Sequence, residues 1–342
     1  MEGNMSNTVS ESKMPEKTQT WRKFVDFLRY IFAIPEVGVL IPLIGFIVIF
    51  YLLNPTFLSP QFVTTMLRTM SFIGVVAIGQ TFLLISGAFD LSVGSTAGLA
   101  AIVFTYAMVK MSLPISVAVM AGLLTGIVVG LVNSFSVLKL GVPAFIATLG
   151  MLYIAKGLTF LISKGYTIYP LPDAIKTFGT AEPFGTSWSF VFFVLLAIIG
   201  HFVLSKTAYG RKLYVVGGNP EVAHLAGINP GLIQLSGFVL TGLCAALGGM
   251  LLSARIVTGN PTIGLGWELN VIAGVVIGGV SLFGGGGSIL GAIIGLLIMQ
   301  VVTSGLVIIG VDAYWQTVAV GVIMVIAVAV DVLRRRSKIA AS

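Results

Sequence analysis

The stretch VGVLIPLIGFIVIFYLL, residues 37–53, carries no charged side chain and is interrupted only by Pro42 and two glycines. A helix that crosses a membrane needs about 20 mostly apolar residues, so this run predicts a transmembrane helix. About 35 mostly polar residues precede it, whereas a signal peptide places only a short basic stretch before its apolar core. We therefore expect this helix to be retained rather than cleaved.

Composition extends this conclusion to the whole chain. Its 342 residues are 57% hydrophobic and 9% charged, and the mean hydropathy is +1.05. A soluble domain carries about 25% charged residues, so the chain has too little polar surface to cover a water-soluble globule. Disorder is also excluded, because disordered chains are poor in apolar residues and rich in charge. The sequence predicts a protein that lies in a lipid bilayer.

Charges, prolines and glycine clusters divide the chain into ten apolar segments. We therefore expect an all-α, polytopic transmembrane bundle of about ten helices. The expected helices span residues 37–53, 64–86, 91–109, 114–137, 143–162, 188–205, 231–253, 268–283, 288–309 and 313–332. Only four residues separate 64–86 from 91–109, so this pair could be broken or re-entrant, and 268–283 is short for a membrane span.

Three basic segments predict how this bundle is oriented. They are the N-terminal tail with five Lys and Arg residues, the loop 206–229 with Lys206, Arg211 and Lys212, and the C-terminal tail with Arg334, Arg335, Arg336 and Lys338. Basic loops stay on the cytoplasmic side, so both termini and this loop should be cytoplasmic. Six predicted helices separate the first two segments and four separate the last two, and both even numbers fit that orientation. The net charge of +7 then reflects membrane orientation rather than nucleic-acid binding.

This layout divides the chain into three parts. They are a cytoplasmic N-terminal tail at 1–35, a transmembrane domain at 36–333 and a cytoplasmic C-terminal tail at 334–342. The loop 163–187 falls on the outside, and its three prolines predict an ordered, turn-rich cap. No segment is long enough for a soluble domain, so an ATPase or a catalytic domain would have to come from another chain.

The sequence predicts neither an enzyme nor a metal site. Cys244 is the only cysteine, and the two histidines, His201 and His224, fall on separate segments. The chain contains neither the phosphate-loop pattern GxxxxGKS/T nor the zinc pattern HExxH. Ser288, in GGGGS, lacks the neighbouring intramembrane histidine that a serine protease needs. The glycine-rich stretch therefore predicts a turn between helices.

Asp90 is the most conspicuous ionisable residue in this layout, because a charge at membrane depth is costly and usually marks a pathway or an internal pair. It lies in SGAFDLSVGS, residues 86–95, together with Ser92 and Ser95. Two interpretations remain open. Asp90 and the serine hydroxyls could cap the helix that follows, or the turn could line or gate a transport pathway.

Further polar residues lie in or at the edge of apolar runs. Hydrogen bonding between helices is their ordinary role, but together they could form the sparse polar lining that a neutral, hydroxylated solute requires. The candidate pathway residues are Gln80, Asp90, Ser92, Ser95, Asn133, Glu268 and Asn270. The chain has no dense series of acids of the kind that proton-coupled carriers use, which disfavours a self-contained secondary transporter.

The loop TAYGRKLYVVGGNPEVAHLAGIN, residues 207–229, contains the signals of a short helix. The Gly217–Gly218 pair predicts a break, Asn219 an N-cap, and Gly227 the end of a helix over 221–226. An ordinary link between helices has about 2–8 residues, so this longer segment predicts a docking element for a cytoplasmic partner. The candidate docking residues are Arg211, Gly217, Gly218, Asn219, Glu221 and Gly227.

Four motifs give the chain a family resemblance. They are GQTFLLISGAFDLSVGS at 79–95, VPAFIATLG at 142–150, YGRKLYVVGGNPEVAHLAGI at 209–228 and VIAGVVIGGVSLFGGGGSILG at 271–291. In this order they resemble the permease subunits of ribose-type ATP-binding cassette importers, which take up monosaccharides and related polyols. The resemblance covers nearly everything after the N-terminal tail. The chain departs from it at Ala88 and Phe89, where members often carry Gly-Ile.

The resemblance implies a pair of permease subunits, identical or different, around one translocation path in the bacterial cytoplasmic (inner) membrane. A cytoplasmic ATPase would bind ATP, so no cofactor is expected in this chain, and an extracytoplasmic sugar-binding protein would deliver the solute. Segment 206–229 would couple the permease domain to the ATPase. Permeases for branched-chain amino acids or nucleosides share this architecture and are the alternative, and a self-contained secondary transporter is a further one.

Overall fold

The computed structural model describes residues 35–341, and this part of the chain is helical apart from turns, loops and one isolated antiparallel bridge between Ile168 and Gly259. The predicted all-α class is confirmed for the described range. The predicted N-terminal tail lies outside the described residues except for Pro35, the first residue of the first helix.

Ten helices match the ten predicted segments. They are α2 (Pro35–Leu53), α3 (Pro60–Ile85), α4 (Val93–Val109), α5 (Ile115–Leu138), α6 (Ala144–Ser163), α8 (Trp188–Lys206), α11 (Pro230–Ile256), α12 (Trp267–Ile277), α13 (Ile289–Ile308) and α14 (Ala313–Ala341). Within the described residues, six of them (α3, α5, α6, α8, α11 and α13) are long and apolar enough to cross a membrane, and the other four contain shorter apolar stretches. The chain is therefore a polytopic helical bundle.

The prediction of one helix over 268–283 was wrong for the second half of that range. α12 ends at Ile277, and a glycine-rich loop, residues 278–288, leads to α13. Gly279 has a φ of +88°, a left-handed conformation that favours glycine. The N–H groups of Gly279 and Val280 donate to the carbonyls of Val276 and Val275, the pattern that ends many helices. Hydropathy does not detect this stop, because the apolar residues Val280, Leu282 and Phe283 follow it.

α3 ends in the same way. Gly87 has a φ of +88°, and its N–H donates to the carbonyl of Leu84 while that of Ala88 donates to Leu83. Residues 86–92 then run without helix to the start of α4. The suspected break between 64–86 and 91–109 is therefore real, and it places Asp90 in a non-helical segment.

Two α-helices in the described range were not predicted. α7 (Asp173–Thr180) packs against α11, and its Phe178 stacks on Trp188 with ring centroids 5.9 Å apart. α9 (Ala208–Gly218) includes both glycines and ends at Gly218, so the predicted break lies one residue later, at Asn219. The predicted short helix is confirmed as α10 (Pro220–Leu225), one residue earlier than expected.

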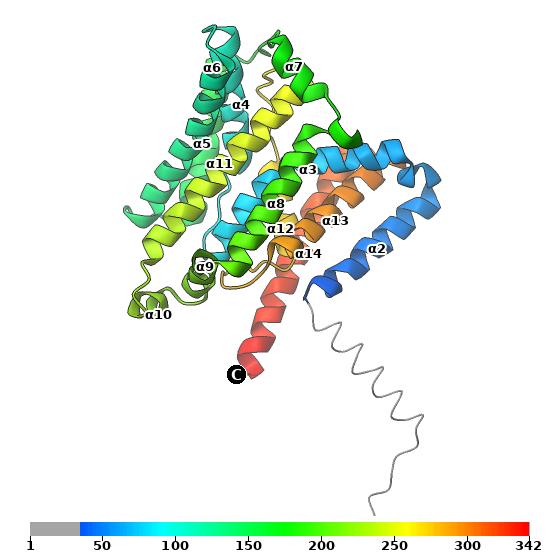
Figure 1. The fold of residues 1–342 in the computed structure, drawn as a ribbon. Helices are drawn as coiled ribbons and strands as arrows, with labels where there is room; N and C mark the ends of the chain where they lie inside the picture. The colour runs from blue at the N-terminus through cyan, green and yellow to red at the C-terminus, as the bar shows by residue number, and fades with distance from the viewer. Residues whose placement is uncertain (1–34, 342) are drawn as a thin grey trace, which may run out of the picture.

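α11 lies in the middle of the bundle and packs against α3, α4 and α5 (Figure 1). Glycines allow this close approach: a Cβ on Gly126 of α5 would overlap the carbonyl of Gly242 on α11, and Gly242 faces Gly126 in the same way. Small residues are typical of helix crossings in membranes, where lipid supplies no hydrophobic force between helices.

The two ends of the bundle carry different short elements. α7 lies at one end, whereas α9, α10 and the C-terminal end of α14 lie at the other (Figure 1). At the α7 end Glu182 pairs with Arg68 of α3, and its Oε1 is 3.8 Å from Nη2 of Arg255 on α11. Two arginines thus share one carboxylate, which holds the connection between α7 and α8 against two long helices.

Candidate functional site

Asp90 lies between α3 and α4 and is only 1% exposed. Its Oδ1 accepts hydrogen bonds from the backbone N–H and the hydroxyl of Ser92, at 2.7 and 2.6 Å. Its Oδ2 accepts one from Nδ2 of Asn133 on α5, at 3.0 Å, and the same nitrogen is 3.0 Å from the Ser92 hydroxyl oxygen. The three side chains form one buried cluster that fixes the start of α4 against α5.

This cluster bears on the two interpretations of Asp90. Ser92 precedes the first residue of α4, and Asp90 holds its N–H in the i to i+2 pattern of an Asx turn. Both carboxylate oxygens are engaged inside the protein, which supports a role at the helix start rather than contact with a solute. Ser95 lies in the first turn of α4 and is also buried.

Gln80 lies apart from this cluster, within α3. Its side chain is fully buried, and neither its Oε1 nor its Nε2 has a hydrogen-bond partner among the described residues. Such groups are rare in native proteins because each costs about 1–3 kcal/mol. The unsatisfied amide keeps Gln80 among the candidate pathway residues.

Glu268 and Asn270 lie near the start of α12 and have different neighbours. The Glu268 carboxylate comes so close to Gly94 on α4 that a Cβ there would overlap it. It also interacts electrostatically with Lys156 on α6. Asn270 donates to the carbonyl of Gly266 at 3.1 Å and lines a cavity toward α3 and α13.

Sequence reasoning missed Lys156. This residue is a lone basic side chain in the apolar helix predicted over 143–162, and it is partly buried in α6. An ionisable residue inside a membrane helix marks a candidate functional site by default. The signal was therefore present, but the electrostatic influence of Lys156 on Glu268 of α12 is visible only in the fold.

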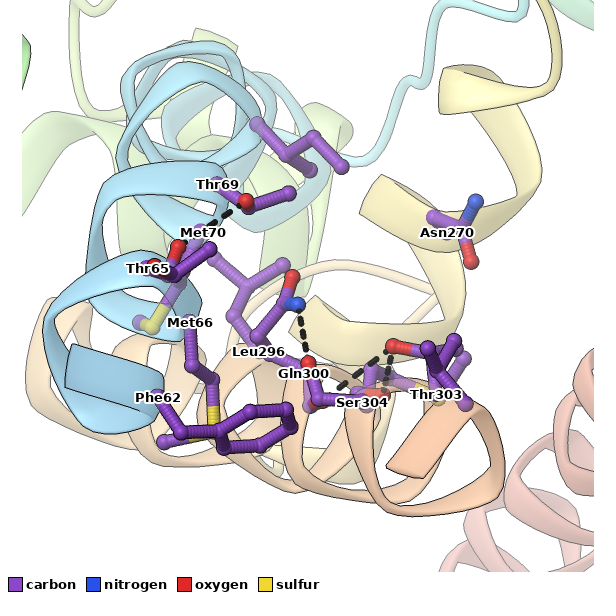
Figure 2. Close-up of a pocket in the computed structure, with 13 residues that line it drawn as sticks. Phe62, Thr65, Met66, Thr69, Met70, Asn270, Leu296, Gln300, Thr303 and Ser304 are labelled. Carbon is purple, nitrogen blue, oxygen red and sulfur yellow. Dashed lines mark hydrogen bonds between the residues drawn. The ribbon is translucent and has the colours of Figure 1, made fainter. Parts of the chain in front are cut away.

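The cavity between α3, α12 and α13 has a volume of about 410 Å³. Figure 2 shows Thr65 and Thr69 on α3 at one side, Asn270 on α12 at the other, and Gln300 of α13 between them. Thr303 and Ser304 complete the polar lining, and Phe62, Met66, Met70, Leu296 and Met299 are among the apolar residues.

Of these polar residues, sequence reasoning identified only Asn270. A usable signal existed, because Gln300, Thr303 and Ser304 follow the i, i+3, i+4 spacing of one helix face in an otherwise apolar run. Thr65 and Thr69 are likewise spaced by four residues. Neither pattern tells which other helix its face meets, so the shared space could not be predicted.

The candidate docking residues lie on α9, α10 and the turn after α10. Asn219 Oδ1 accepts the N–H groups of Glu221 and Val222 at 2.9 and 3.1 Å, so Asn219 is the N-cap of α10. Gly227 follows α10 with a φ of +77°. Arg211 and Glu221 are exposed, and Leu225 is 87% exposed, which leaves α10 with charged and apolar surface facing outward.

The inner side of α9 contacts two parts of the bundle at once. A Cβ on Gly217 would overlap the carbonyl of Ile85, the last residue of α3, and would crowd the N–H of Gly285 in the loop 278–288. The Tyr214 hydroxyl donates to the carbonyl of Gly287 in that loop at 2.7 Å. Gly218 has open space around it, so of the two glycines only Gly217 is required by packing.

Tyr209 fixes the start of α9 to the core. Its ring stacks on Phe82 of α3 with centroids 6.4 Å apart, and its hydroxyl shares a 2.7 Å hydrogen bond with Ser236 of α11. Burial raises the pKa of Tyr209, and the bond with Ser236 opposes that change less strongly. The phenol therefore stays protonated at neutral pH, and α9 is held against the bundle along its length.

The chain is similar in sequence to known membrane permeases. Residues 62–328 match the family described as branched-chain amino acid transport system / permease component. The chain is 36% identical to the fructose import permease protein of Rhizobium meliloti over 307 residues, which cover 87% of this chain and 84% of that protein. It is 34% identical over 330 residues to the galactose/methyl galactoside import permease protein of Escherichia coli K12, with 91% and 97% covered.

A third relative is the ribose import permease protein of Bacillus subtilis 168, which is 34% identical over 318 residues, with 92% of this chain and 98% of that protein covered. No solved structure is significantly similar to the chain. The described residues contain six helices that are long and apolar enough to cross a membrane, and the relatives are import permeases. The chain is therefore a multi-pass protein of the bacterial cytoplasmic membrane and a permease rather than an enzyme. It belongs to the family of transport-system permease components that includes sugar import permeases.

Proposed function

We propose that the chain is the membrane subunit of an ATP-binding cassette importer and forms the translocation path for a monosaccharide or a related polyol. The observation that carries this proposal is the identity of 34–36%, over most of the chain, with permeases named for fructose, galactose and ribose. The alternative substrate is a branched-chain amino acid, because the description of the matching family names branched-chain amino acid transport.

The lining of the cavity between α3, α12 and α13 suits a sugar better than an amino acid. None of the residues that line it is charged, whereas a zwitterionic amino acid carries an ammonium and a carboxylate that need compensating partners away from water. A neutral solute with many hydroxyl groups needs only hydroxyl and amide partners, and these are the polar groups present.

The energy for import comes, in this proposal, from separate subunits. The chain has no phosphate-loop motif, so a cytoplasmic ATPase binds ATP, and an extracytoplasmic sugar-binding protein delivers the solute. A second permease subunit, identical or different, completes the path. The end of the bundle with α9, α10 and the C-terminal end of α14 then faces the cytoplasm (Figure 1), and α7 faces outward.

The segment 206–229 is the coupling element of this proposal. Its outer surface exposes Arg211, Glu221 and Leu225, and its inner side touches the end of α3 and the loop 278–288. A rigid-body movement of the ATPase could therefore reach both through α9. The permease domain remains 36–333 with flanking cytoplasmic tails; helix α14 continues beyond that boundary to Ala341.

Uptake measurements test this proposal. The chain is co-expressed with the ATPase and binding-protein subunits of its own organism in a host that lacks sugar permeases, and radiolabelled ribose, fructose and galactose are supplied. We expect uptake of at least one sugar that is lost when the ATPase phosphate-loop lysine is replaced. Uptake of leucine or a nucleoside but no sugar would establish the alternative. Uptake by this chain alone, driven by an ion gradient, would establish a secondary transporter.

A further inference from the structure

The cavity between α3, α12 and α13 has the size and the lining of a solute site. Its volume of about 410 Å³ lies within the range of small-molecule pockets, about 300–1,000 Å³. We propose that this cavity binds the neutral, polyhydroxylated solute during its passage, with Gln300 as the central polar contact. This inference rests on the proposed function and identifies where in the molecule the solute binds.

The threonines of the cavity present oxygen acceptors. The hydroxyls of Thr65, Thr69 and Thr303 donate to the carbonyls of Gln61, Thr65 and Met299, at 2.9, 3.0 and 3.0 Å. Their hydrogens are therefore turned toward their own helices, and each oxygen keeps capacity to accept a bond. A solute with several O–H donors complements this arrangement.

The two amides supply donors as well as acceptors. Gln300 Nε2 donates to the Ser304 hydroxyl at 2.8 Å, and Asn270 Nδ2 donates to the carbonyl of Gly266 at 3.1 Å. Within the described residues each amide uses one N–H in this way, so a second N–H and the carbonyl oxygen are left for a ligand. Gln300 lies between Asn270 and the threonines of α3 (Figure 2), so one solute can reach all three helices.

The same lining argues against a groove filled by lipid. Polar groups that face hydrocarbon lose their hydrogen bonds to water and are costly there. Six polar side chains from three helices converge on this space, whereas the lipid side of a membrane helix is ordinarily apolar. A water-accessible space that receives hydroxyl groups satisfies the same side chains without that cost.

Uptake kinetics of lining variants test the assignment. Gln300→Leu removes the amide and Thr303→Val removes a hydroxyl at nearly constant shape, while Gln61→Leu, on an exposed residue of α3 outside the cavity, is the matched control. We expect each lining variant to lower the maximal uptake rate about two- to tenfold, as loss of one hydrogen bond predicts. The half-saturating concentration should not change, because the binding protein sets it. Immunoblots of membranes check that all variants are inserted equally.

Thiol labelling tests the site without using transport. In a Cys244→Ser background, Gln300→Cys should react with a membrane-impermeant thiol reagent added from outside, and saturating sugar with its binding protein should slow that reaction. The neighbouring Val301, which is 0% exposed, should stay unmodified as Val301→Cys. Reaction of Gln300→Cys with a membrane-permeant reagent alone would show a lipid-filled space and overturn the inference.

The outcomes separate the two proposals. Wild-type sugar uptake with unchanged rates in both lining variants overturns the cavity assignment and leaves the proposed function intact. Absence of sugar uptake by the wild type overturns the proposed function and, with it, a sugar in the cavity. Reduced rates together with labelling from outside support both.

Discussion

The backbone N–H of Gly285 donates a 2.9 Å hydrogen bond to the carbonyl oxygen of Ile85. This bond joins the loop 278–288 to the last residue of α3, and Gly217 of α9 packs against the same two residues. A displacement of α9 would therefore act on α3 and on the connection between α12 and α13 at a single point. The helices α3, α12 and α13 enclose the proposed solute cavity.

The packing of Gly217 predicts a large difference between two adjacent glycines. Gly217→Ala would force a methyl group into the carbonyl of Ile85, and overpacking of this kind costs about 1–3 kcal/mol. Gly218→Ala meets open space and should change stability by less than about 0.5 kcal/mol. Thermal unfolding of the purified variants in detergent measures both. Equal losses would show that the contact with Ile85 does not constrain α9.

The exposed surface of α10 predicts a loss of coupling without a loss of folding. Leu225 is 87% exposed, so Leu225→Ser should leave the unfolding temperature of the chain unchanged. If Leu225 docks the ATPase, this variant should lower sugar-stimulated ATP hydrolysis about tenfold or more, as expected for an anchoring residue. The control is Leu140→Ser, on a leucine that is 63% exposed between α5 and α6. Normal stimulated hydrolysis by Leu225→Ser would remove α10 as the coupling surface.

The ten helices that match predicted segments could be located because apolar runs report membrane helices directly, although α12 ends at Ile277, before the predicted end at 283. The errors concern places where tertiary contacts decide. The helix α9, which ends at Gly218, was missed, and the contact of its Gly217 with Ile85 is visible only in the fold. α7 escaped prediction because it is short and lies among prolines, and its Gly179 is held against the carbonyl of Ala254.

The residues of the candidate site also fall into two groups, those that the sequence identifies and those that only the fold reveals. Asp90, Ser92 and Asn133 could be singled out from the sequence because polar groups stand out in apolar runs, and the fold brings these three together. Which polar helix faces share a space is a property of the packing. Gln300 was therefore missed, although it lines the same cavity as Asn270.

The cluster around Asp90 predicts an ordered series of variants. Asp90→Leu leaves the N–H of Ser92 and the amide of Asn133 without their partner in a buried place, which costs about 3 kcal/mol or more. Asp90→Asn keeps an oxygen for Ser92 but sets two amides against each other, so its loss should be smaller. The exchange Asp90→Asn with Asn133→Asp restores one donor and one acceptor and should recover part of the stability. Unfolding temperatures and sugar uptake rank the three, and no recovery in the exchange would argue against a direct Asp90–Asn133 bond.

The electrostatic interaction between Lys156 on α6 and Glu268 on α12 predicts coupled effects of mutation. Lys156 and Glu268 are both only partly buried and form no ion pair within 4 Å among the described residues, so Lys156→Met and Glu268→Gln should each lower stability by no more than about 1 kcal/mol. The double variant leaves neither charge, so its loss should be smaller than the sum of the single losses by about 0.5 kcal/mol or more. Lys110→Met, on an exposed lysine just after α4, is the control and should combine additively with Glu268→Gln. Unfolding free energies of the four-member cycle measure the coupling. Additive losses for Lys156 and Glu268 would mean that the two charges are independently solvated.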